Sequence, residues 1–299
     1  MKNYDNLLID SFLFEKSINE WLSPGTIKNY TTMFNLLCNN PYININKSNT
    51  FTEINFKRLL WDYLTKLNWG SHTYNKYRKN IKIYCDYLVK EKFLTINPIK
   101  DIKVRKTWKT IPKYLNTKQI IQVKRLIEQE FSCDDYITTR NKTILYFYLF
   151  SWLRLYELIN LKLDDIDFIN QTIKINKWKW NKDRLIPLIH KLWDKLLPYL
   201  QKKKSSKINT NILFPTRFKW YMQHRDIYNI LNKIKPYLNY NLTPHMFRHT
   251  FATELVRKNI NIYNVSRILW HSDLKTTQIY LWLDLQAVNI SLNEAVLFS

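Results

Sequence analysis

The chain has 299 residues, of which 47 are Lys or Arg and 24 are Asp or Glu, so its formal net charge at pH 7 is +23. This length suffices for two domains with their own cores, which excludes a small scaffold dependent on disulfides or metals. The three cysteines lie far apart without metal-binding spacing, which favours free thiols in a reducing, intracellular compartment. The charge favours a phosphate polyanion as partner, although the Lys-rich composition of an AT-rich genome also explains it.

The first third of the chain is expected to be helical. Its N-terminus lacks a basic region followed by an apolar run and a cleavage site, so no signal peptide is predicted. The Ser-Pro-Gly-Thr run at 23–26 is a helix-start signal, and apolar residues follow it at helical spacing. The helices are expected at residues 12–21, from 23 to about 37, at 52–67 and at 71–89. Asn97-Pro98 then breaks the pattern.

The next stretch, residues 99–113, is strongly basic and lacks periodicity. We interpret it as an interdomain linker that lies along DNA, with a solvated charged loop as the alternative. The expected boundaries are a helical domain at 1–105, a basic linker at 106–113 and a second domain at 114–299. The candidate DNA-binding residues in this linker region and in a later hairpin are Lys103, Arg105, Lys106, Lys109, Lys177 and Lys182.

The second domain is predicted to be mostly helical with one small antiparallel sheet. Strand-like alternation occurs only at 167–176, around a turn at Asn170-Gln171, and at 184–188. The apolar run at 144–153 is too short to span a bilayer and indicates a core helix. Helices are expected at residues 117–130, 138–153, 191–203, 227–238, 245–258, 262–269 and 276–285.

Chemistry-bearing side chains form four clusters in the second half. Each has an ordinary explanation when taken alone, such as a surface cap for an arginine after an apolar helix or a core position for a tyrosine. Two residues three apart on a helix face can be a structural polar pair. The clusters are LRLYEL at 153–158, KWKWNKDR at 177–184, TPHMFRH at 243–249, and LWHS at 269–272 followed by Tyr280.

The order, spacing and flanking residues of these clusters resemble the tyrosine recombinase (phage integrase) family. That family has an Arg after Gly-Leu, a hairpin Lys, then His-x-x-Arg, then Leu-Gly-His, and a Tyr nine residues later. The match spans residues 114–285, and its portion from HMFRHTFAT to TTQIY is the most specific. The resemblance implies a mainly α fold with a helical, SAM-like core-binding domain and an α-rich catalytic domain.

The resemblance also implies a role for each candidate. Tyr280 is the nucleophile that forms a 3′-phosphotyrosyl link, and Arg154 and Arg248 grip the scissile phosphate. His245 bonds the phosphate or assists proton transfer, and His271 donates to a nonbridging oxygen. The further implied residues are Lys179, which protonates the departing 5′ oxygen, and Glu157, which orients its neighbours.

Elementary chemistry agrees with these roles. A phosphodiester is anionic, so its pentacovalent state needs fixed cationic donors. The sequence lacks paired carboxylates at metal spacing, which disfavours a two-metal nuclease. Because rejoining uses the energy of the covalent intermediate, no cofactor and no metal is expected. A phenol has a pKa of about 10, so nearby guanidinium charge should help it to ionise.

Tryptophan stands where the family has glycine. The chain has 11 tryptophans and only two glycines, whereas ordinary usage predicts roughly 21 glycines. We hypothesise that the gene comes from an organism that reads UGA as glycine and that UGA is written here as tryptophan. A divergent or decayed enzyme is the alternative, and UGG codons would exclude recoding. The positions concerned are Trp21, Trp152, Trp178, Trp180 and Trp270.

The leading functional hypothesis is a site-specific recombinase, either an Xer-like resolvase or a mobile-element integrase. The resemblance implies a double-stranded DNA site and a tetramer on DNA that passes through a Holliday junction, formed by copies of this chain alone or together with a partner recombinase. The chain end at 288–299 contains a short apolar segment, which is expected either to dock on a neighbouring subunit or to fold back on its own domain. We expect a cytoplasmic, nucleoid-associated protein without a membrane partner. The alternatives are a type IB topoisomerase-like relaxing enzyme and a catalytically impaired DNA-binding protein.

Overall fold

The computed structural model describes residues 7–18, 22, 24–108, 112–176, 183–206, 208–216, 221–269, 275–278 and 280. The chain divides into two compact units, the N-terminal unit (Met1–Lys109) and the C-terminal unit (Thr110–Ser299). Each unit has its own hydrophobic core, as two domains of this size require.

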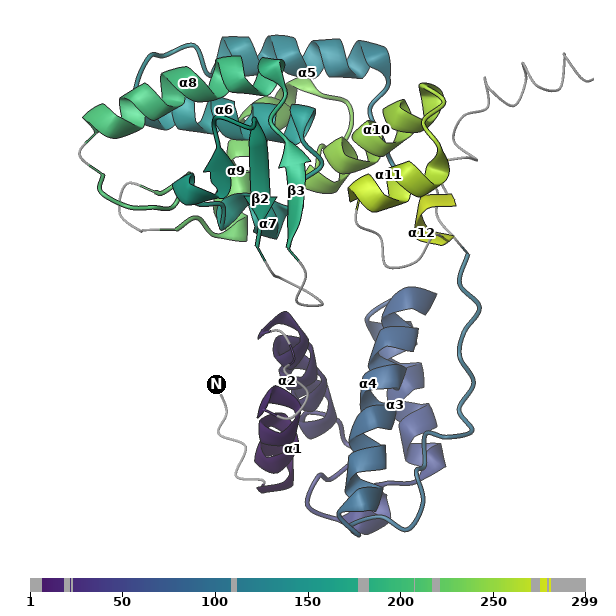
Figure 1. Cartoon of the computed structure of the whole chain (residues 1–299). Helices are drawn as coiled ribbons and strands as arrows, with labels where there is room; N and C mark the ends of the chain where they lie inside the picture. The colour runs from purple at the N-terminus through teal and green to yellow at the C-terminus, as the bar shows by residue number, and fades with distance from the viewer. Residues whose placement is uncertain are drawn as a thin grey trace, which may run out of the picture. The chain divides into compact units, whose positions relative to one another are not determined.

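The described part of the N-terminal unit is built mainly from helices (Figure 1), which pack around a core rich in aromatic side chains. The α-helices are α1 (Leu7–Ile18), α2 (Pro24–Cys38), α3 (Glu53–Lys66) and α4 (Ser71–Lys90), with a 3-10 turn η1 (Ser48–Thr50). Phe12 on α1 is fully buried, and the rings of Tyr30, Phe34 and Tyr84 meet it edge-to-face at centroid distances of 5.1, 5.7 and 5.3 Å. This arrangement is the one that the charge distribution of aromatic rings favours. The core thus ties α1 to α2 and α4.

The basic stretch after α4 begins as part of the N-terminal unit. Ile99 and Ile102 are buried among the residues of its core. The interpretation of all of 99–113 as an interdomain linker is therefore too broad, because its first residues pack as core. The charged side chains that follow these isoleucines are exposed.

Asn75 on α4 anchors the end of this stretch. Its Nδ2 donates to the carbonyl of Arg105 at 2.8 Å, and its Oδ1 accepts from the amide of Arg105 at 2.8 Å. Asn75→Ala is expected to raise the exchange rate of the Arg105 amide about fivefold to tenfold, because a hydrogen bond contributes about 1 kcal/mol. Hydrogen exchange followed by NMR measures the exchange rate of the Arg105 amide, with Asn80→Ala on the same helix as control. Unchanged exchange in Asn75→Ala would contradict the anchoring role.

The C-terminal unit is α-rich, with α6 packed against α8 and α10 (Figure 1). Its described helices are α5 (Thr117–Glu130), α6 (Tyr136–Phe150), α7 (Leu155–Ile159), α8 (His190–Ser205), α9 (His224–Ile234), α10 (Pro244–Arg257), α11 (Ile262–Leu269) and α12 (Lys275–Gln278), with 3-10 turns η2 (Leu163–Asp165) and η3 (Lys235–Tyr237). The described strands are β1 (Ile166–Asp167), β2 (Thr172–Ile175) and β3 (Arg184–Pro187). They form an antiparallel sheet in the order β1-β2-β3, with Ile173 opposite Ile186. The predicted mainly α fold with a small antiparallel sheet is confirmed.

Local capping explains where the main helices begin. Asn116 and Gln119 form a reciprocal capping box at the start of α5, with both bonds at 2.9 Å. Asp135 accepts two backbone N–H groups at the start of α6, and Thr243 accepts one at the start of α10, where Pro244 occupies the first turn. These side chains satisfy N–H groups that have no partner within the helix. The caps fix the start of α5, α6 and α10, and α10 carries His245 and Arg248.

The predicted helix at 138–153 ends early, at Phe150. Ser151 is extended, with φ −126° and ψ 156°, and its Oγ donates to the carbonyl of Phe147 at 2.6 Å. A serine that satisfies a last-turn carbonyl in this way helps the chain leave the helix. The chain then turns at Arg154 into α7, a short helix that the sequence pattern did not predict. The early end of α6 creates the loop on which the candidate site is built.

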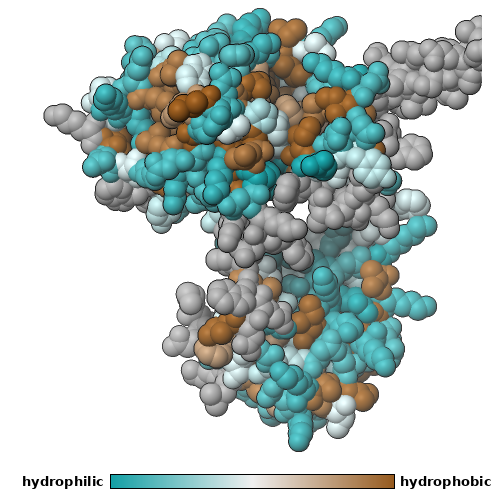
Figure 2. All heavy atoms as spheres, in the orientation of Figure 1, coloured by the Kyte–Doolittle hydropathy of each residue, from teal (hydrophilic) through white to brown (hydrophobic). Residues whose placement is uncertain are grey.

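On the face shown in Figure 2, hydrophilic residues cover much of both units, with hydrophobic ones scattered among them. Scattered apolar side chains are normal at a protein surface. Among the described helices, none combines the length and the apolar character needed to cross a membrane.

Candidate functional site

Arg154 lies at the N-cap of α7, and Glu157 fixes its position. The backbone N–H of Arg154 donates to Oε2 of Glu157 at 2.8 Å, and its guanidinium Nη1 donates to Oε1 at 3.0 Å. The side chain of Arg154 is 36% exposed, whereas that of Glu157 is 4% exposed. One face of the guanidinium group is therefore held by protein while part of the side chain is accessible to solvent.

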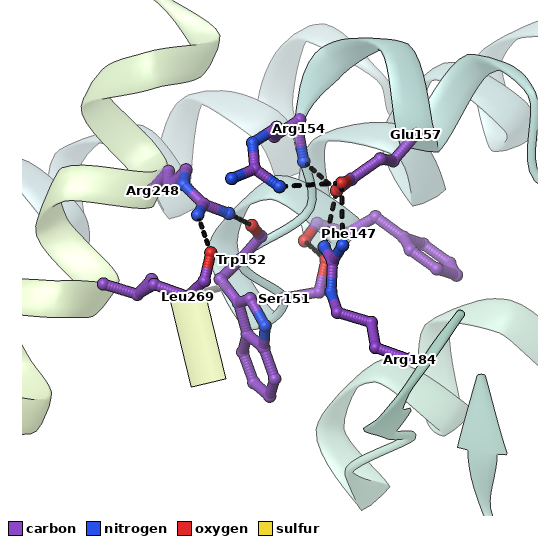
Figure 3. Close-up of polar contacts among 8 residues, drawn as sticks. All are labelled: Phe147, Ser151, Trp152, Arg154, Glu157, Arg184, Arg248 and Leu269. Carbon is purple, nitrogen blue, oxygen red and sulfur yellow. Dashed lines mark hydrogen bonds and ion pairs between the residues drawn. The ribbon is translucent and has the colours of Figure 1, made fainter. Parts of the chain in front are cut away.

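Arg184 reaches the same carboxylate from β3. Its two terminal nitrogens bond Oε1 and Oε2 of Glu157 at 2.9 and 2.7 Å, which is the bidentate geometry of a strong pair. Figure 3 shows Glu157 between the guanidinium groups of Arg154 and Arg184. Burial alone would raise the pKa of Glu157, but Arg184, assisted by Arg154, outweighs burial and holds that pKa below its usual value. A single ionised carboxylate thus joins the sheet to the loop before α7.

Arg248 projects from α10 and is buried. Its two terminal nitrogens donate to the backbone carbonyls of Trp152 and Leu269, as the dashed lines in Figure 3 show. Burial, followed by the charge of Arg154, lowers the pKa of Arg248 to about 9, so the group stays charged at neutral pH. Neither of these hydrogen bonds goes to a carboxylate. The charge of Glu157 opposes the effect of burial on the pKa of Arg248 but does not outweigh it, so this buried cation favours an incoming anion.

His245 and His249 lie one turn apart on α10, with ring centroids separated by 6.5 Å. His245 is exposed at the surface. Desolvation, and then the charges of Arg248 and Arg154, lower the pKa of His245. This coupling shows that His245 shares the positive electrostatic environment of the two arginines.

Tyr280 is 2% exposed, and its phenol Oη lies 2.7 Å from Nδ1 of His249. Burial raises the pKa of Tyr280, and the charge of Arg248 opposes that rise. The guanidinium charge of Arg248 thus favours ionisation of this phenol, as expected, but burial has the larger effect and the pKa remains above its usual value. The phenol is held protonated beside a histidine.

The structure brings most of the described candidates into one electrostatically coupled group. Arg154, Glu157 and Arg248 surround the loop between α6 and α7, with His245 coupled to both arginines and Arg248 coupled to Tyr280. The predicted site residues that lie outside the described part of the chain are Lys109, Lys177, Lys179, Lys182 and His271.

The described DNA-binding candidates all belong to the N-terminal unit. Lys103, Arg105 and Lys106 are exposed. The guanidinium of Arg105 lies over the ring of Tyr74 at 5.4 Å, and Nζ of Lys106 lies 4.5 Å from the ring centroid of Trp108. Two basic side chains of this exposed segment therefore lie against aromatic rings, that of Tyr74 on α4 and that of Trp108 in the segment itself. Their exposed positive charge suits a phosphate backbone.

Sequence reasoning missed two residues, Arg184 and His249. The alternation in β3 could have pointed to Arg184, because it shares the inward face with Ile186 two residues later. His249 is four residues after His245, and this helical spacing places both on one side of α10. Each signal was present in the sequence but has a common structural explanation when it stands alone.

Trp152 is the one residue of the tryptophan-for-glycine set that falls within the described ranges. It is 6% exposed, and its ring packs on Phe251 at a centroid distance of 4.8 Å. Its buried Nε1 has no hydrogen-bond partner among the described residues, and its backbone φ is not positive. Tryptophan is therefore accommodated here without backbone strain, at the expense of one unsatisfied donor. The other four positions lie outside the described residues.

The donor set of this site suits anions rather than metal ions. Arginine and histidine side chains dominate it, and Glu157 is saturated by two guanidinium groups. Within the described ranges, no group of three or more His, Cys, Asp or Glu is placed to hold a metal ion. These arginine and histidine side chains can therefore bind an anion of the size of a phosphate next to the buried phenol of Tyr280.

Comparisons with known proteins agree with this chemistry. Residues 113–286 match the family model described as "Phage integrase family". The chain is 30% identical over 289 residues to "Tyrosine recombinase XerC" of Psychromonas ingrahamii, covering 93% of this chain and 92% of that protein. It shares its fold with the XerH site-specific recombinase bound to palindromic difH substrate, with a TM-score of 0.76, 20% identity, and coverage of 95% and 83% of the two chains. A DNA complex of the Tn1549 transposon integrase gives a TM-score of 0.72 at 18% identity, covering 91% and 93%.

Proposed function

Because the chain belongs to the phage integrase family of tyrosine recombinases, we propose that it cuts and rejoins DNA at a specific site through a covalent 3′-phosphotyrosyl link to Tyr280. The observation that carries this proposal is the buried guanidinium of Arg248. It is coupled electrostatically to Arg154 and Tyr280, and its hydrogen bonds go to backbone carbonyls. A scissile phosphate that binds there adds a negative charge beside this buried cation.

In the proposed reaction each of these side chains has one role. Oη of Tyr280 attacks phosphorus as its proton leaves, and the bond from phosphorus to the 5′ oxygen breaks. Arg154 and Arg248 donate to the nonbridging oxygens, where negative charge builds up in the transition state. His245 and His271 add donors to the phosphate, and Lys179 protonates the leaving 5′ oxygen. In the reverse step the 5′ hydroxyl attacks the phosphotyrosyl link, so that no external energy source is required.

Binding to double-stranded DNA is proposed from charge and from the relatives. The net charge of +23 favours association through release of the counterions that surround DNA. The fold relatives include a recombinase bound to its difH substrate and an integrase in complex with a circular intermediate DNA. The basic contacts are assigned to Lys103, Arg105, Lys106, Lys109, Lys177 and Lys182.

Strand exchange between two sites requires more than one copy of the active site. We therefore assign to this chain a tetramer on DNA that passes through a Holliday junction, with a second recombinase as a possible partner in that tetramer. Because its substrate is proposed to be DNA, we also place the protein in the cytoplasm, in association with the nucleoid. Observation of synapsed DNA sites distinguishes this function from that of a monomeric relaxing enzyme.

Trapping of a covalent adduct tests the proposed function. Covalent ends are first mapped on genomic DNA, and a nicked suicide substrate is built from the mapped site, so that the short 5′-hydroxyl fragment diffuses away. The wild-type chain is expected to form an adduct stable to denaturant, and Tyr280→Phe is expected to form none. Tyr263→Phe is the control, because Tyr263 on α11 is 64% exposed.

The same experiment is run on a chain with glycine at positions 152, 178, 180 and 270. An adduct only in that chain would show that the tryptophans impair the enzyme. No adduct from either chain, or an adduct that persists in Tyr280→Phe, would overturn the proposed function.

A further inference from the structure

The phenol of Tyr280 has a histidine partner outside the expected catalytic set. Nδ1 of His249 lies 2.7 Å from Oη of Tyr280, and the two ring centroids are 5.8 Å apart. Tyr280 is 2% exposed, so bulk water has little access to its hydroxyl. Among the described contacts, the nitrogen best placed to receive the phenol proton is therefore Nδ1 of His249.

The helix holds this nitrogen in place. Nδ1 is attached to the ring carbon next to Cβ, so its position follows the backbone more closely than that of Nε2 does. His249 directly follows Arg248 on α10, whose two carbonyl contacts fix this part of the helix against neighbouring segments. Thr253 also donates to the carbonyl of His249 at 2.9 Å. The Nδ1 atom is thus presented to Tyr280 from a rigid element.

The protonation state of His249 suits an acceptor. Burial, and then the neighbouring His245 and Arg248, lower the pKa of His249 to about 4, so its ring is neutral near pH 7. A neutral ring with its proton on Nε2 has a free acceptor at Nδ1. The tyrosine hydroxyl is then the donor in the 2.7 Å contact.

We propose that His249 is a further catalytic residue, whose Nδ1 holds the Tyr280 phenol and takes its proton as Oη bonds to phosphorus. This inference rests on the proposed function. The O–H bond of Tyr280 breaks, the O–P bond forms, and the proton stays on His249 until rejoining, when the departing phenolate takes it back. The 5′ oxygen receives its proton from a separate group, which the proposed function names as Lys179.

Binding of DNA would strengthen this base. The ring of His249 is a poor proton acceptor while the site is empty, first because it is buried and then because His245 and Arg248 repel a further positive charge. A phosphate that binds Arg248 and Arg154 offsets that repulsion at the moment when the proton has to move. The tyrosine therefore stays protonated and sheltered without DNA and is activated by the phosphate it attacks.

A substitution that keeps the contact but removes the basicity tests this proposal. The amide of asparagine places a polar atom near the Nδ1 position yet does not accept a proton at neutral pH. His249→Asn is expected to lower the single-turnover rate of adduct formation on the mapped suicide substrate by about 10² to 10⁴-fold, the usual contribution of a general base. DNA affinity is expected to stay within about twofold, because the uncharged ring contacts Tyr280. His190→Asn, at the exposed start of α8, is the matched control.

Fluorotyrosine at position 280 separates proton transfer from positioning. Its more acidic phenol needs less help from a base, so it is expected to recover part of the rate lost in His249→Asn. A rate in His249→Asn within threefold of wild type, while Tyr280→Phe forms no adduct, would overturn the role of His249 and leave the proposed function intact. A slow His249→Asn that gains nothing from fluorotyrosine would overturn proton transfer. Failure of the wild-type and glycine-restored chains to form an adduct would overturn both proposals.

Discussion

Arg248→Lys is expected to slow covalent cleavage by about 10³-fold, because loss of a guanidinium from a phosphoryl-transfer site has effects of this order. Lysine keeps the positive charge but has one nitrogen, whereas Arg248 bonds the carbonyls of Trp152 and Leu269 with two. Lysine cannot reproduce both contacts and still present a donor to a phosphate in the same plane. Single-turnover adduct formation on the mapped suicide substrate measures the effect.

Arg257→Lys is the control for this experiment. Arg257 lies on the same helix and bonds Glu254 at 3.0 Å and the hydroxyl of Tyr114 at 3.3 Å. The Arg257→Lys substitution is expected to change the cleavage rate little. A folded Arg248→Lys protein that cleaves within tenfold of wild type would show that the guanidinium geometry is not needed.

Glu157→Gln is expected to destabilise the C-terminal unit by about 3–5 kcal/mol, because it leaves the buried Arg184 without its counter-charge. The side chains of Glu157 and Arg184 are 4% and 8% exposed, so water cannot replace the lost carboxylate. For a unit of this size the melting temperature is expected to fall by about 6–20 °C. Thermal unfolding followed by circular dichroism measures the change. A drop of about 1 kcal/mol or less would mean that the pair contributes no more than a surface ion pair.

The pH dependence of this effect has a defined sign. The pKa of Glu157 is depressed in the folded state, so its contribution is fully present above its unfolded pKa of about 4.3 and is lost as pH falls through the folded pKa. The stability gap between wild type and Glu157→Gln is therefore expected to narrow below about pH 4. The control is Glu254→Gln, whose pair with Arg257 is partly exposed at 37% and 29%, and its small effect is expected to stay within about 1 kcal/mol.

Much of the fold could be predicted from periodicity and capping. Asn116 and Gln119 mark the start of α5 in the sequence itself, and the hairpin turn at Asn170-Gln171 falls where φ of Gln171 is 49°. The end of α6 could not be predicted, because its apolar pattern continues to Leu153. The helix stops earlier because Ser151 is extended and its hydroxyl bonds the carbonyl of Phe147, while Arg154 and Glu157 begin α7; these are local polar contacts that an apolar pattern does not display.

The spacing of the sequence motifs was sufficient to predict several residues of the candidate site. Arg154, His245 and Arg248 were identified in that way, and their electrostatic coupling is present in the structure. The partners of these residues were not predictable, because they depend on tertiary contacts. Arg184 reaches Glu157 across 27 residues, and His249 reaches Tyr280 across 31. Spacing along a chain cannot show which side chain a distant residue will meet.

The contacts that hold Arg248 have a consequence for how this site can change over evolutionary time. Both acceptors are main-chain carbonyls, contributed by the residues at 152 and 269. Every amino acid carries the same carbonyl, so a substitution at either position cannot delete the acceptor as long as the backbone keeps its path. Glycine and tryptophan at position 152 can therefore offer Arg248 the same oxygen. The contact with Arg248 therefore constrains the course of the main chain at these two positions, whereas the residue types there are constrained separately by the packing of two buried side chains.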